Sequence, residues 1–226
     1  SSMARYSRIE VAVRMRETGI IPVFYNKDSG ICRNVIKACY EGGVRVFEFT
    51  NRGDYAHELF SELNKWAEKN YPDLIMGVGS VTDSGTSSLY IQLGANFIVS
   101  PILNPDMAKV CNRRKILWCP GCASLSEISY AEELGAEIVK IFPGSSVGGP
   151  AFVKAVKGPC PWTSIMPTGG VEPTMDNLKE WFSSGVTCVG IGSKLISGEM
   201  IQKEEWGLLT TKVGEAVNIV RSLRNK

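Results

Sequence analysis

The sequence predicts a (β/α)8 barrel, in which eight parallel strands, each followed by a helix, form a single domain with an N-terminal helix. Eight short runs rich in apolar and β-branched residues recur roughly 20–30 residues apart. The stretches between these runs carry helical periodicity, and glycines stand directly before several runs. A chain of 226 residues is long enough for one such barrel.

The eight candidate strands are, in order, Ile20–Tyr25, Val44–Thr50, Leu74–Ser80, Asn96–Pro101, Ile116–Gly121, Ile138–Pro143, Ser164–Gly170 and Cys188–Ser193. They are almost continuously apolar, which is typical of parallel strands covered by helices on one side and by barrel side chains on the other. A doubly wound open sheet would also explain the alternation, but it gives no special weight to the number eight.

Helices are expected between the strands. The clearest pattern has apolar residues at helical spacing: Ala56, Leu59, Phe60, Leu63, Trp66 and Ala67. Helix ends are marked by glycines that favour a left-handed backbone: Gly42-Gly43, Gly94, Gly135 and Gly185. No linker or low-complexity segment interrupts the chain. We therefore expect one domain over residues 3–226, with Ser1 and Ser2 as residues added for expression ahead of a native start.

Composition and charge narrow the function. The net charge is +2, with no run of five basic residues, so neither nucleic acid nor a membrane surface is an expected partner. No apolar stretch approaches the roughly 20 residues that span a bilayer, and no signal pattern is present. Seven cysteines are too few for a disulfide scaffold, and an odd number leaves one unpaired. A reducing, cytoplasmic location is expected.

A glutamate interrupts the second strand. In Val44–Thr50, period-two alternation puts Val46, Glu48 and Thr50 on one face and two phenylalanines on the other. Because the aromatic face should meet the helices, Glu48 is expected to point into the barrel. A carboxylate there is costly unless it is paired, so Glu48 is either a catalytic group or a structural glutamate tied to an arginine.

The sixth strand holds the only lysine well inside any candidate strand, Lys140. If Val139 and Ile141 pack on helices, Lys140 faces the interior, where desolvation lowers the pKa of an amine and leaves a neutral nucleophile. A structural ion pair with Glu48 is the alternative, although such pairs contribute little stability. A lysine nucleophile with a carboxylate for proton transfer suits Schiff-base chemistry on a carbonyl substrate.

Glycine-rich turns end the last two strands, at Pro167–Gly170 and Gly190–Ser193. Barrels often bind phosphate at these two loops, because bare backbone amides can approach the oxygens. A phosphorylated substrate is therefore expected, and Gly170→Val should place a side chain where the phosphate lies.

Other motifs favour no metal and no cofactor. Cys119-Pro120-Gly121-Cys122 has metal or redox spacing, but no second such motif or histidine pair accompanies it, so buried thiols at a strand end are expected. The single histidine, His57, lies on the polar side of a helical run and should be exposed. No nucleotide-binding glycine motif follows the first strand. Chelators should therefore leave activity unchanged.

With these residues in place, the chain resembles the bacterial 2-keto-3-deoxy-6-phosphogluconate (KDPG)/4-hydroxy-2-oxoglutarate (KHG) aldolases, which are class I Schiff-base enzymes. The resemblance covers about Gly19 to Leu195. Its most specific segments are Gly42–Arg52, Gly77–Val81, Val139–Pro143 and Pro167–Val171.

The resemblance implies a role for each matching residue. Lys140 matches the Schiff-base lysine, Glu48 the general acid/base and Arg52 the arginine that holds the substrate carboxylate. The remaining matches are substrate contacts and pocket walls (Ser80, Thr168, Pro101 and Phe142) and the phosphate site (Gly169, Gly170, Gly192 and Ser193). Two positions depart from the family. Ser80 replaces the usual threonine, and Ile191 replaces the first of two glycines before the serine.

The implied activity is that of a lyase that reversibly cleaves a 2-keto-3-deoxy-6-phospho sugar acid to pyruvate and glyceraldehyde 3-phosphate, the aldol step of the Entner-Doudoroff pathway. The family is typically homotrimeric. Two alternatives remain open at this point: a phosphosugar isomerase or epimerase that uses Glu48 as a base, and a non-catalytic phosphosugar-binding protein. The sequence also leaves open the stereochemistry at C4 and a preference for KHG.

Overall fold

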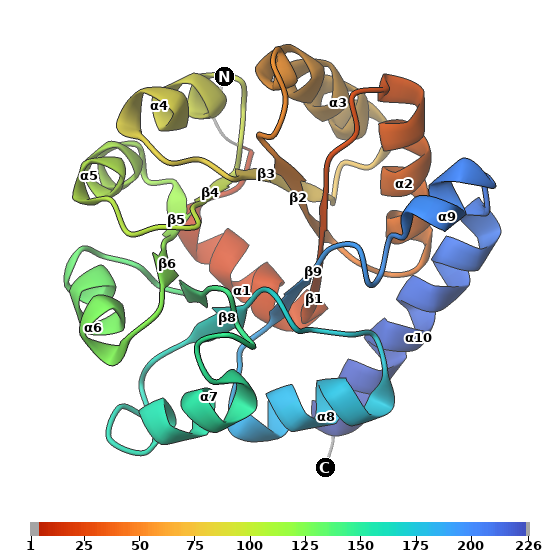
Figure 1. Ribbon diagram of the computed structural model, residues 1–226. Coiled ribbons are helices and arrows are strands. Elements are labelled where there is room, and N and C mark those ends of the chain that lie inside the picture. Colours follow the sequence, from red (N-terminus) through yellow and green to blue (C-terminus); the bar gives the residue numbers. More distant parts are fainter. Residues whose placement is uncertain (1–4, 225–226) are drawn as a thin grey trace.

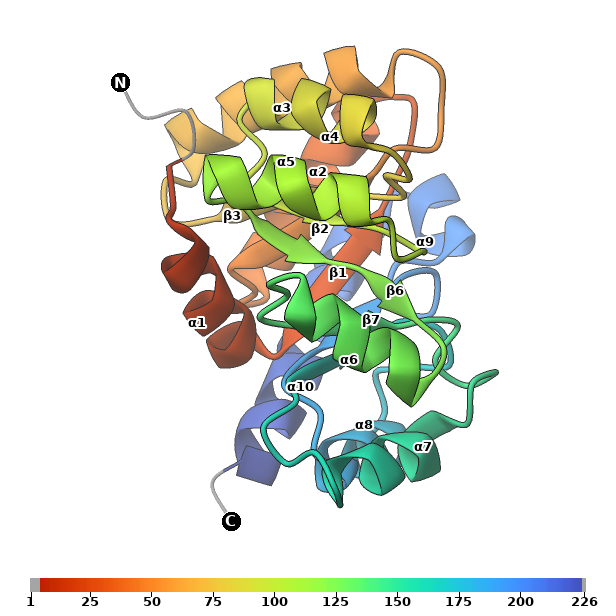
Figure 2. The same cartoon turned by 90° about the vertical axis from the view of Figure 1, so that its left-hand side faces the viewer.

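A computed structural model describes residues 5–224. Residues 1–4 and 225–226, which include the expected start at Met3, lie outside the described part. Parallel strands occupy the centre and helices surround them (Figure 1). In the view turned by 90°, the strands run away from the first helix, α1 (Arg8–Thr18), toward the opposite end of the molecule (Figure 2). The N-terminal helix predicted from the sequence is therefore confirmed.

Strands occur in every one of the eight predicted runs. Their bounds are β1 Ile20–Phe24, β2 Val46–Thr50, β3 Ile75–Gly79, β4 Phe97–Val99, β5 Leu117–Cys119, β6 Gly121–Cys122, β7 Val139–Ile141, β8 Ile165–Pro167 and β9 Val189–Ile191. The fifth run is divided into β5 and β6, because Pro120 has no backbone N–H with which to continue the ladder.

Helices fill the intervals between strands. Their bounds are α2 Ser29–Glu41, α3 Ala56–Asn70, α4 Ser84–Gln92, α5 Pro105–Arg114, α6 Leu125–Glu133, α7 Gly149–Lys157, α8 Met175–Ser184, α9 Gly198–Gln202 and α10 Trp206–Arg224. Several begin at a side chain that accepts a hydrogen bond from the first turn, as Asp28 does from the amide of Ile31. The glycines predicted at helix ends have positive φ, except Gly42: they are Gly43, Gly94, Gly135 and Gly185.

All strand pairs are parallel, and they form two curled sheets. One has the order β5-β4-β3-β2-β1-β9 and the other the order β6-β7-β8. A single bridge between Thr168 and Gly190 joins β8 to β9. The α/β class with parallel strands is therefore confirmed. The predicted single ring of eight strands is not continuous: the pairing is interrupted at Pro120, and one bridge at Thr168 connects β8 with β9.

In β1 to β5 and in β8, neighbouring strand residues belong to two separate apolar clusters. The inner cluster contains Val46 and also Val11 and Met15 of α1, so α1 covers the amino end of the strands (Figure 1). The outer cluster contains Phe47 and Phe49, which pack with the surrounding helices. The two faces predicted for β2 from its alternation are therefore correct.

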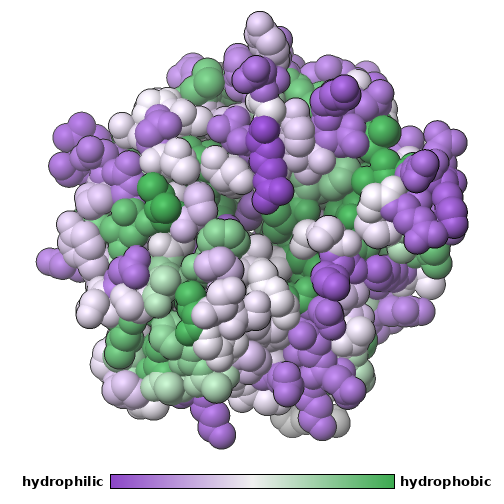
Figure 3. All heavy atoms as spheres, viewed as in Figure 1, coloured by the Kyte–Doolittle hydropathy of each residue, from purple (hydrophilic) through white to green (hydrophobic). Residues whose placement is uncertain are grey.

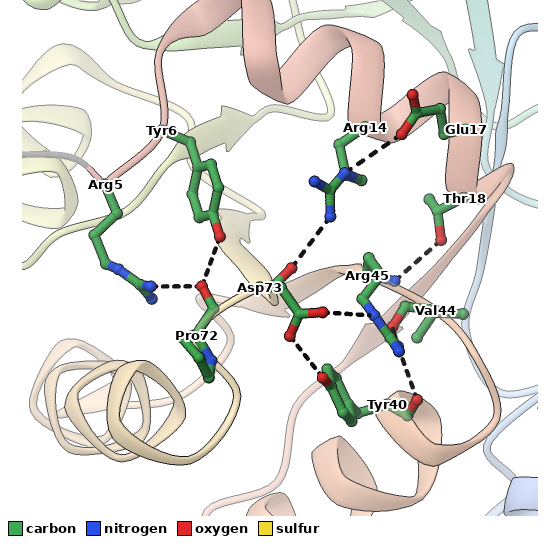
Figure 4. Close-up of polar contacts among 10 residues, drawn as sticks. All are labelled: Arg5, Tyr6, Arg14, Glu17, Thr18, Tyr40, Val44, Arg45, Pro72 and Asp73. Carbon is green, nitrogen blue, oxygen red and sulfur yellow. Dashed lines mark hydrogen bonds and ion pairs between the residues drawn. The ribbon is translucent and has the colours of Figure 1, made fainter.

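Polar contacts secure the amino end of the strands (Figure 4). The Asp73 carboxylate accepts hydrogen bonds from the Tyr40 hydroxyl at 2.6 Å and from Arg45 Nε at 3.1 Å, and Arg14 donates to the Asp73 carbonyl at 3.4 Å. Burial works against ionisation of Asp73, but the hydrogen bond from Tyr40 and the charge of Arg45 outweigh it and lower the pKa of Asp73. These contacts hold α1 and two strands together, and the carboxyl ends remain free for a site.

Within residues 5–224, no helix combines the length and apolar character that crossing a membrane requires.

Candidate active site

Glu48 and Lys140 lie on different strands and face the interior. Glu48 sits in β2 between Val23 of β1 and Gly77 of β3, with only 2% of its surface exposed. Lys140 sits in β7 with 5% exposed. Because its neighbours Val139 and Ile141 belong to the outer cluster, Lys140 points inward, as its alternation predicts.

The two groups perturb each other's ionisation. Burial raises the pKa of Glu48, and the positive charges of Lys140 and Arg52 oppose that rise. Burial lowers the pKa of Lys140, and the Glu48 charge opposes that fall. The Lys140 ammonium nitrogen lies 4.6 Å from the centre of the Phe142 ring. An amine whose pKa is lowered has more of its neutral, nucleophilic form at a given pH.

A glycine makes room for the Glu48 carboxylate. A Cβ added at Gly79 of β3 would lie 2.0 Å from Glu48 Oε2. Any larger residue at this position would therefore displace the carboxylate.

A pocket of about 530 Å³ opens at the carboxyl ends of the strands. It brings together seven of the predicted site residues: Arg52, Phe142, Thr168, Gly169, Gly170, Gly192 and Ser193. Thr50 and Phe142 also line it, and each follows an inward-facing residue, Glu48 or Lys140, by two positions. Because side chains on one strand face repeat every second residue, we infer that Glu48 and Lys140 lie one layer beneath the pocket. Figure 3 views this end of the molecule and shows apolar surface beside its centre, with hydrophilic residues gathered toward the upper and right-hand sides.

Ser80 and Pro101 are outside the residues that line this pocket. Ser80 directly follows β3, and Pro101 lies shortly after the end of β4. Both are therefore at the same end of the molecule as the pocket. Ser80 has a φ of 58°, a left-handed conformation that few residues other than glycine adopt. Such backbone conformations are concentrated at functional sites.

Thr168 presents an unsatisfied polar atom at the pocket wall. Its Oγ1 is buried and has no hydrogen-bond partner among residues 5–224. Buried hydroxyls are normally hydrogen-bonded, so this atom is available to a bound molecule.

The two glycine turns differ in what they tolerate. Gly170 has a φ of 76°, and a Cβ there would lie 2.4 Å from the Cβ of Ser145. The expectation that Gly170→Val would simply occupy the phosphate position is therefore corrected: the added side chain meets Ser145, and the backbone is strained. At Gly192, a Cβ would meet only the Val23 carbonyl oxygen, at 3.7 Å.

Sequence reasoning missed several residues of this region. Tyr25 and Lys194 line the pocket, and the Tyr90 hydroxyl donates to Asn51 Oδ1 at 2.6 Å, next to Arg52. Lys194 could have been found from its place directly after Ser193. No sequence pattern connects Tyr90 with Asn51, because their contact depends on how α4 packs.

The two cysteines of the Cys119–Cys122 motif lie buried at β5 and β6, as predicted. Cys119 and Cys122 are buried free thiols, and burial raises the pKa of Cys122 to about 12. His57 is half-buried, not fully exposed as expected. Across the described residues, no three histidine, cysteine or acidic side chains are grouped as metal ligands.

A buried amine and a buried carboxylate beneath an open pocket, at the carboxyl ends of parallel strands, define an enzyme of the α/β class. Comparison with known proteins specifies the class further. The family model described as KDPG and KHG aldolase matches residues 11–212. The 2-dehydro-3-deoxy-phosphogluconate aldolase of Pseudoalteromonas atlantica is 32% identical over 88% of this chain and 89% of its own length. The KHG/KDPG aldolase of Escherichia coli is 29% identical over 88% and 90%, respectively.

Solved structures agree with these relatives. A KDPG aldolase from Legionella pneumophila, with pyruvate captured as a covalent carbinolamine, is 28% identical with a TM-score of 0.82, over 91% of this chain and 97% of that one. A 2-keto-3-deoxy-6-phosphogluconate aldolase of Zymomonas mobilis, crystallised with 3-phosphoglycerate, is 25% identical with a TM-score of 0.79, over 93% and 96%. The chain belongs to the KDPG and KHG aldolase family. It is therefore an aldolase, a lyase, and the isomerase and non-catalytic alternatives are set aside.

Proposed function

We propose that the protein cleaves a 2-keto-3-deoxy-6-phospho sugar acid of the KDPG type to pyruvate and glyceraldehyde 3-phosphate through a lysine Schiff base. The observation that carries this proposal is the burial of Lys140 and Glu48, each two positions before a residue that lines the pocket. The names of the relatives support the substrate, and the carbinolamine in the Legionella enzyme supports the covalent chemistry.

Lys140 attacks the C2 ketone, and loss of water gives an iminium ion. The C3–C4 bond then breaks: its electron pair moves into the iminium and forms an enamine, while the C4 hydroxyl loses its proton and becomes the aldehyde carbonyl. Protonation of the enamine at C3 and addition of water release pyruvate and restore Lys140. The lowered pKa of Lys140 favours the first step, because the attacking amine must be neutral.

Glu48 moves the protons in this scheme: to the leaving hydroxyl, from the C4 hydroxyl and to C3, through water where needed. Its raised pKa suits a group that must both take up and release protons. Arg52 holds the C1 carboxylate with its planar guanidinium group, aided by Ser80 and by the unsatisfied hydroxyl of Thr168.

Phe142 and Pro101 form walls of the substrate site in this proposal. The 6-phosphate binds the backbone amides of Gly169, Gly170, Gly192 and Ser193. The strands act as one closed (β/α)8 barrel within a single domain, since β5 and β6 flank Pro120 and the Thr168–Gly190 bridge joins the other two edges.

We propose that the protein is a homotrimer, as is typical of the family. Light scattering should then give three times the 24.7 kDa mass of the chain. We propose a cytoplasmic location because all seven cysteines are free thiols, which a reducing compartment maintains. A monomeric mass would overturn the first of these two proposals.

Borohydride trapping tests the mechanism. Wild-type protein incubated with pyruvate and borohydride should gain a stable adduct on the peptide that contains Lys140, whereas Lys140→Ala should gain none and should not cleave KDPG. Circular dichroism of Lys140→Ala checks that the fold is intact. An adduct on another lysine, or cleavage by Lys140→Ala, would show that the assignment is wrong.

A further inference from the structure

Two cationic side chains line the pocket among the described residues, and the proposed mechanism uses only one of them. Arg52 follows β2, and Lys194 follows β9; the two strands flank β1 on either side. A KDPG-type substrate is anionic at both ends, with a carboxylate at C1 and a phosphate at C6. Arg52 is proposed for the carboxylate, which leaves Lys194 without a function.

Lys194 lies beside the residues proposed for the phosphate. It directly follows Ser193, and Gly170, Gly192 and Ser193 share the pocket lining with it. The amides of Leu195 and Ile196 both donate to the Gly192 carbonyl at 3.0 Å, which closes a tight turn. The turn therefore keeps the Lys194 backbone next to the phosphate-binding amides.

Lys194 has a carboxylate partner on the neighbouring loop. Its Nζ lies 3.7 Å from Glu172 Oε1, and the two side chains are 67% and 45% exposed. The Glu172 loop is held by Asn177, whose Oδ1 accepts from the Glu172 amide at 2.7 Å and whose Nδ2 donates to the Gly170 carbonyl at 3.1 Å. Exposed ion pairs of this kind are weak, so Lys194 can exchange this partner at little cost.

Backbone amides supply only partial charges to a phosphate, whereas a lysine supplies a full and mobile one. Lys194 lines the pocket, so its ammonium group has only to leave one weak, competing carboxylate in order to reach the phosphate. We propose that Lys194 is a specificity-determining residue that leaves Glu172 to bind the 6-phosphate, and so favours phosphorylated substrates over KHG. This inference rests on the proposed function, since it assigns a charge partner to the phosphate of that substrate.

The test compares Lys194→Met with a matched control, Lys203→Met. Lys203 is 61% exposed and pairs with Glu199 at 2.7 Å, but it does not line the pocket. We expect Lys194→Met to lower kcat/KM for KDPG about tenfold relative to that for KHG, mainly through KM, because a charge-assisted hydrogen bond is lost. Lys203→Met should leave this ratio unchanged, and Lys194→Arg should largely restore it.

A second measurement uses 3-phosphoglycerate as the probe. Its Kd, measured by calorimetry, should rise about tenfold in Lys194→Met and should be unchanged or lower in Glu172→Gln, where the competing carboxylate is neutral. If wild-type protein does not cleave KDPG, the proposed function fails. If wild-type protein cleaves KDPG while Lys194→Met keeps both the wild-type ratio and the wild-type Kd, only the role of Lys194 is overturned.

Discussion

At the scale of single residues, the opposed effects on Glu48 and Lys140 determine when the amine is reactive. The Glu48 charge works against the fall in the pKa of Lys140, because a nearby carboxylate stabilises the ammonium form. In Glu48→Gln this attraction is lost, so the pKa of Lys140 should fall further. The rate of carbamylation of Lys140 by cyanate, followed by peptide mass spectrometry, should therefore reach its half-maximum at a lower pH than in wild-type protein.

Although the amine of Glu48→Gln should become reactive at a lower pH, turnover of this variant should fall. Glu48→Gln should cleave KDPG on the order of 10²–10⁴ times more slowly, because the general acid/base is missing. Lys109, exposed on α5, is recovered in the same digest and serves as an internal control for the reagent. If the pH midpoint for carbamylation of Lys140 is unchanged or higher in Glu48→Gln, then the Glu48 charge does not stabilise the ammonium form of Lys140.

Alternation along a strand was enough to predict that Glu48 and Lys140 face inward, because side-chain direction there follows from a period of two. Which way a Cβ would point at a turn glycine could not be predicted. Gly170 and Gly192 look alike in sequence, but a Cβ on Gly170 would meet Ser145 and one on Gly192 would have space. Ser145 approaches from the loop after β7, and that approach is a matter of tertiary packing.

At the scale of elements, α4 steadies the loop after β2. Tyr90 is fully buried, its ring meets Phe60 edge-on, and its hydroxyl donates to Asn51, the neighbour of Arg52. Burial raises the pKa of Tyr90 to about 12, so the donor remains protonated throughout an ordinary assay range. We therefore expect Tyr90 to act as a positioning residue for Arg52.

Tyr90→Phe should reduce the free energy of unfolding by about 1 kcal/mol, the usual contribution of one such hydrogen bond. It should also raise KM several-fold, with a smaller change in kcat, because Arg52 is less well held. Tyr40→Phe is the matched control: it loses a 2.6 Å bond to Asp73 at the amino end of the strands. That variant should lose stability without a change in KM. Equal KM values in the two variants would mean that Tyr90 is purely structural.

Element order was predictable because apolar runs and helix-ending glycines recur at regular intervals along the chain. The division of the fifth strand could also have been predicted, since Pro120 cannot donate a hydrogen bond to a strand ladder. The run Ile116–Gly121 was interpreted as one strand because its residues are mostly apolar. The sparse pairing of β8 with β9, which consists of one bridge and a hydrogen bond from the Thr187 amide to the Ile165 carbonyl, was not predictable, since it depends on how the two strands approach each other in the folded molecule.

At the scale of the whole molecule, Thr168 and Gly190 meet where the proposed barrel closes. A Cβ at Gly190 would lie 2.6 Å from Thr168 Oγ1, and its next contact, Val23 Cγ2, would be at an ordinary 3.5 Å. Alanine normally suits a strand at least as well as glycine does. Any loss of stability in Gly190→Ala should therefore come from Thr168.

We expect Gly190→Ala to lower the free energy of unfolding in urea by about 1–3 kcal/mol, as overpacking does. Thr168→Ala removes the obstructing hydroxyl, which has no partner to lose among the described residues, so the double variant should recover most of that stability. Its aldolase activity should remain low, because the proposed contact of Thr168 with the pyruvyl group is missing. If the double variant is as unstable as Gly190→Ala alone, the contact between Thr168 and Gly190 does not limit closure.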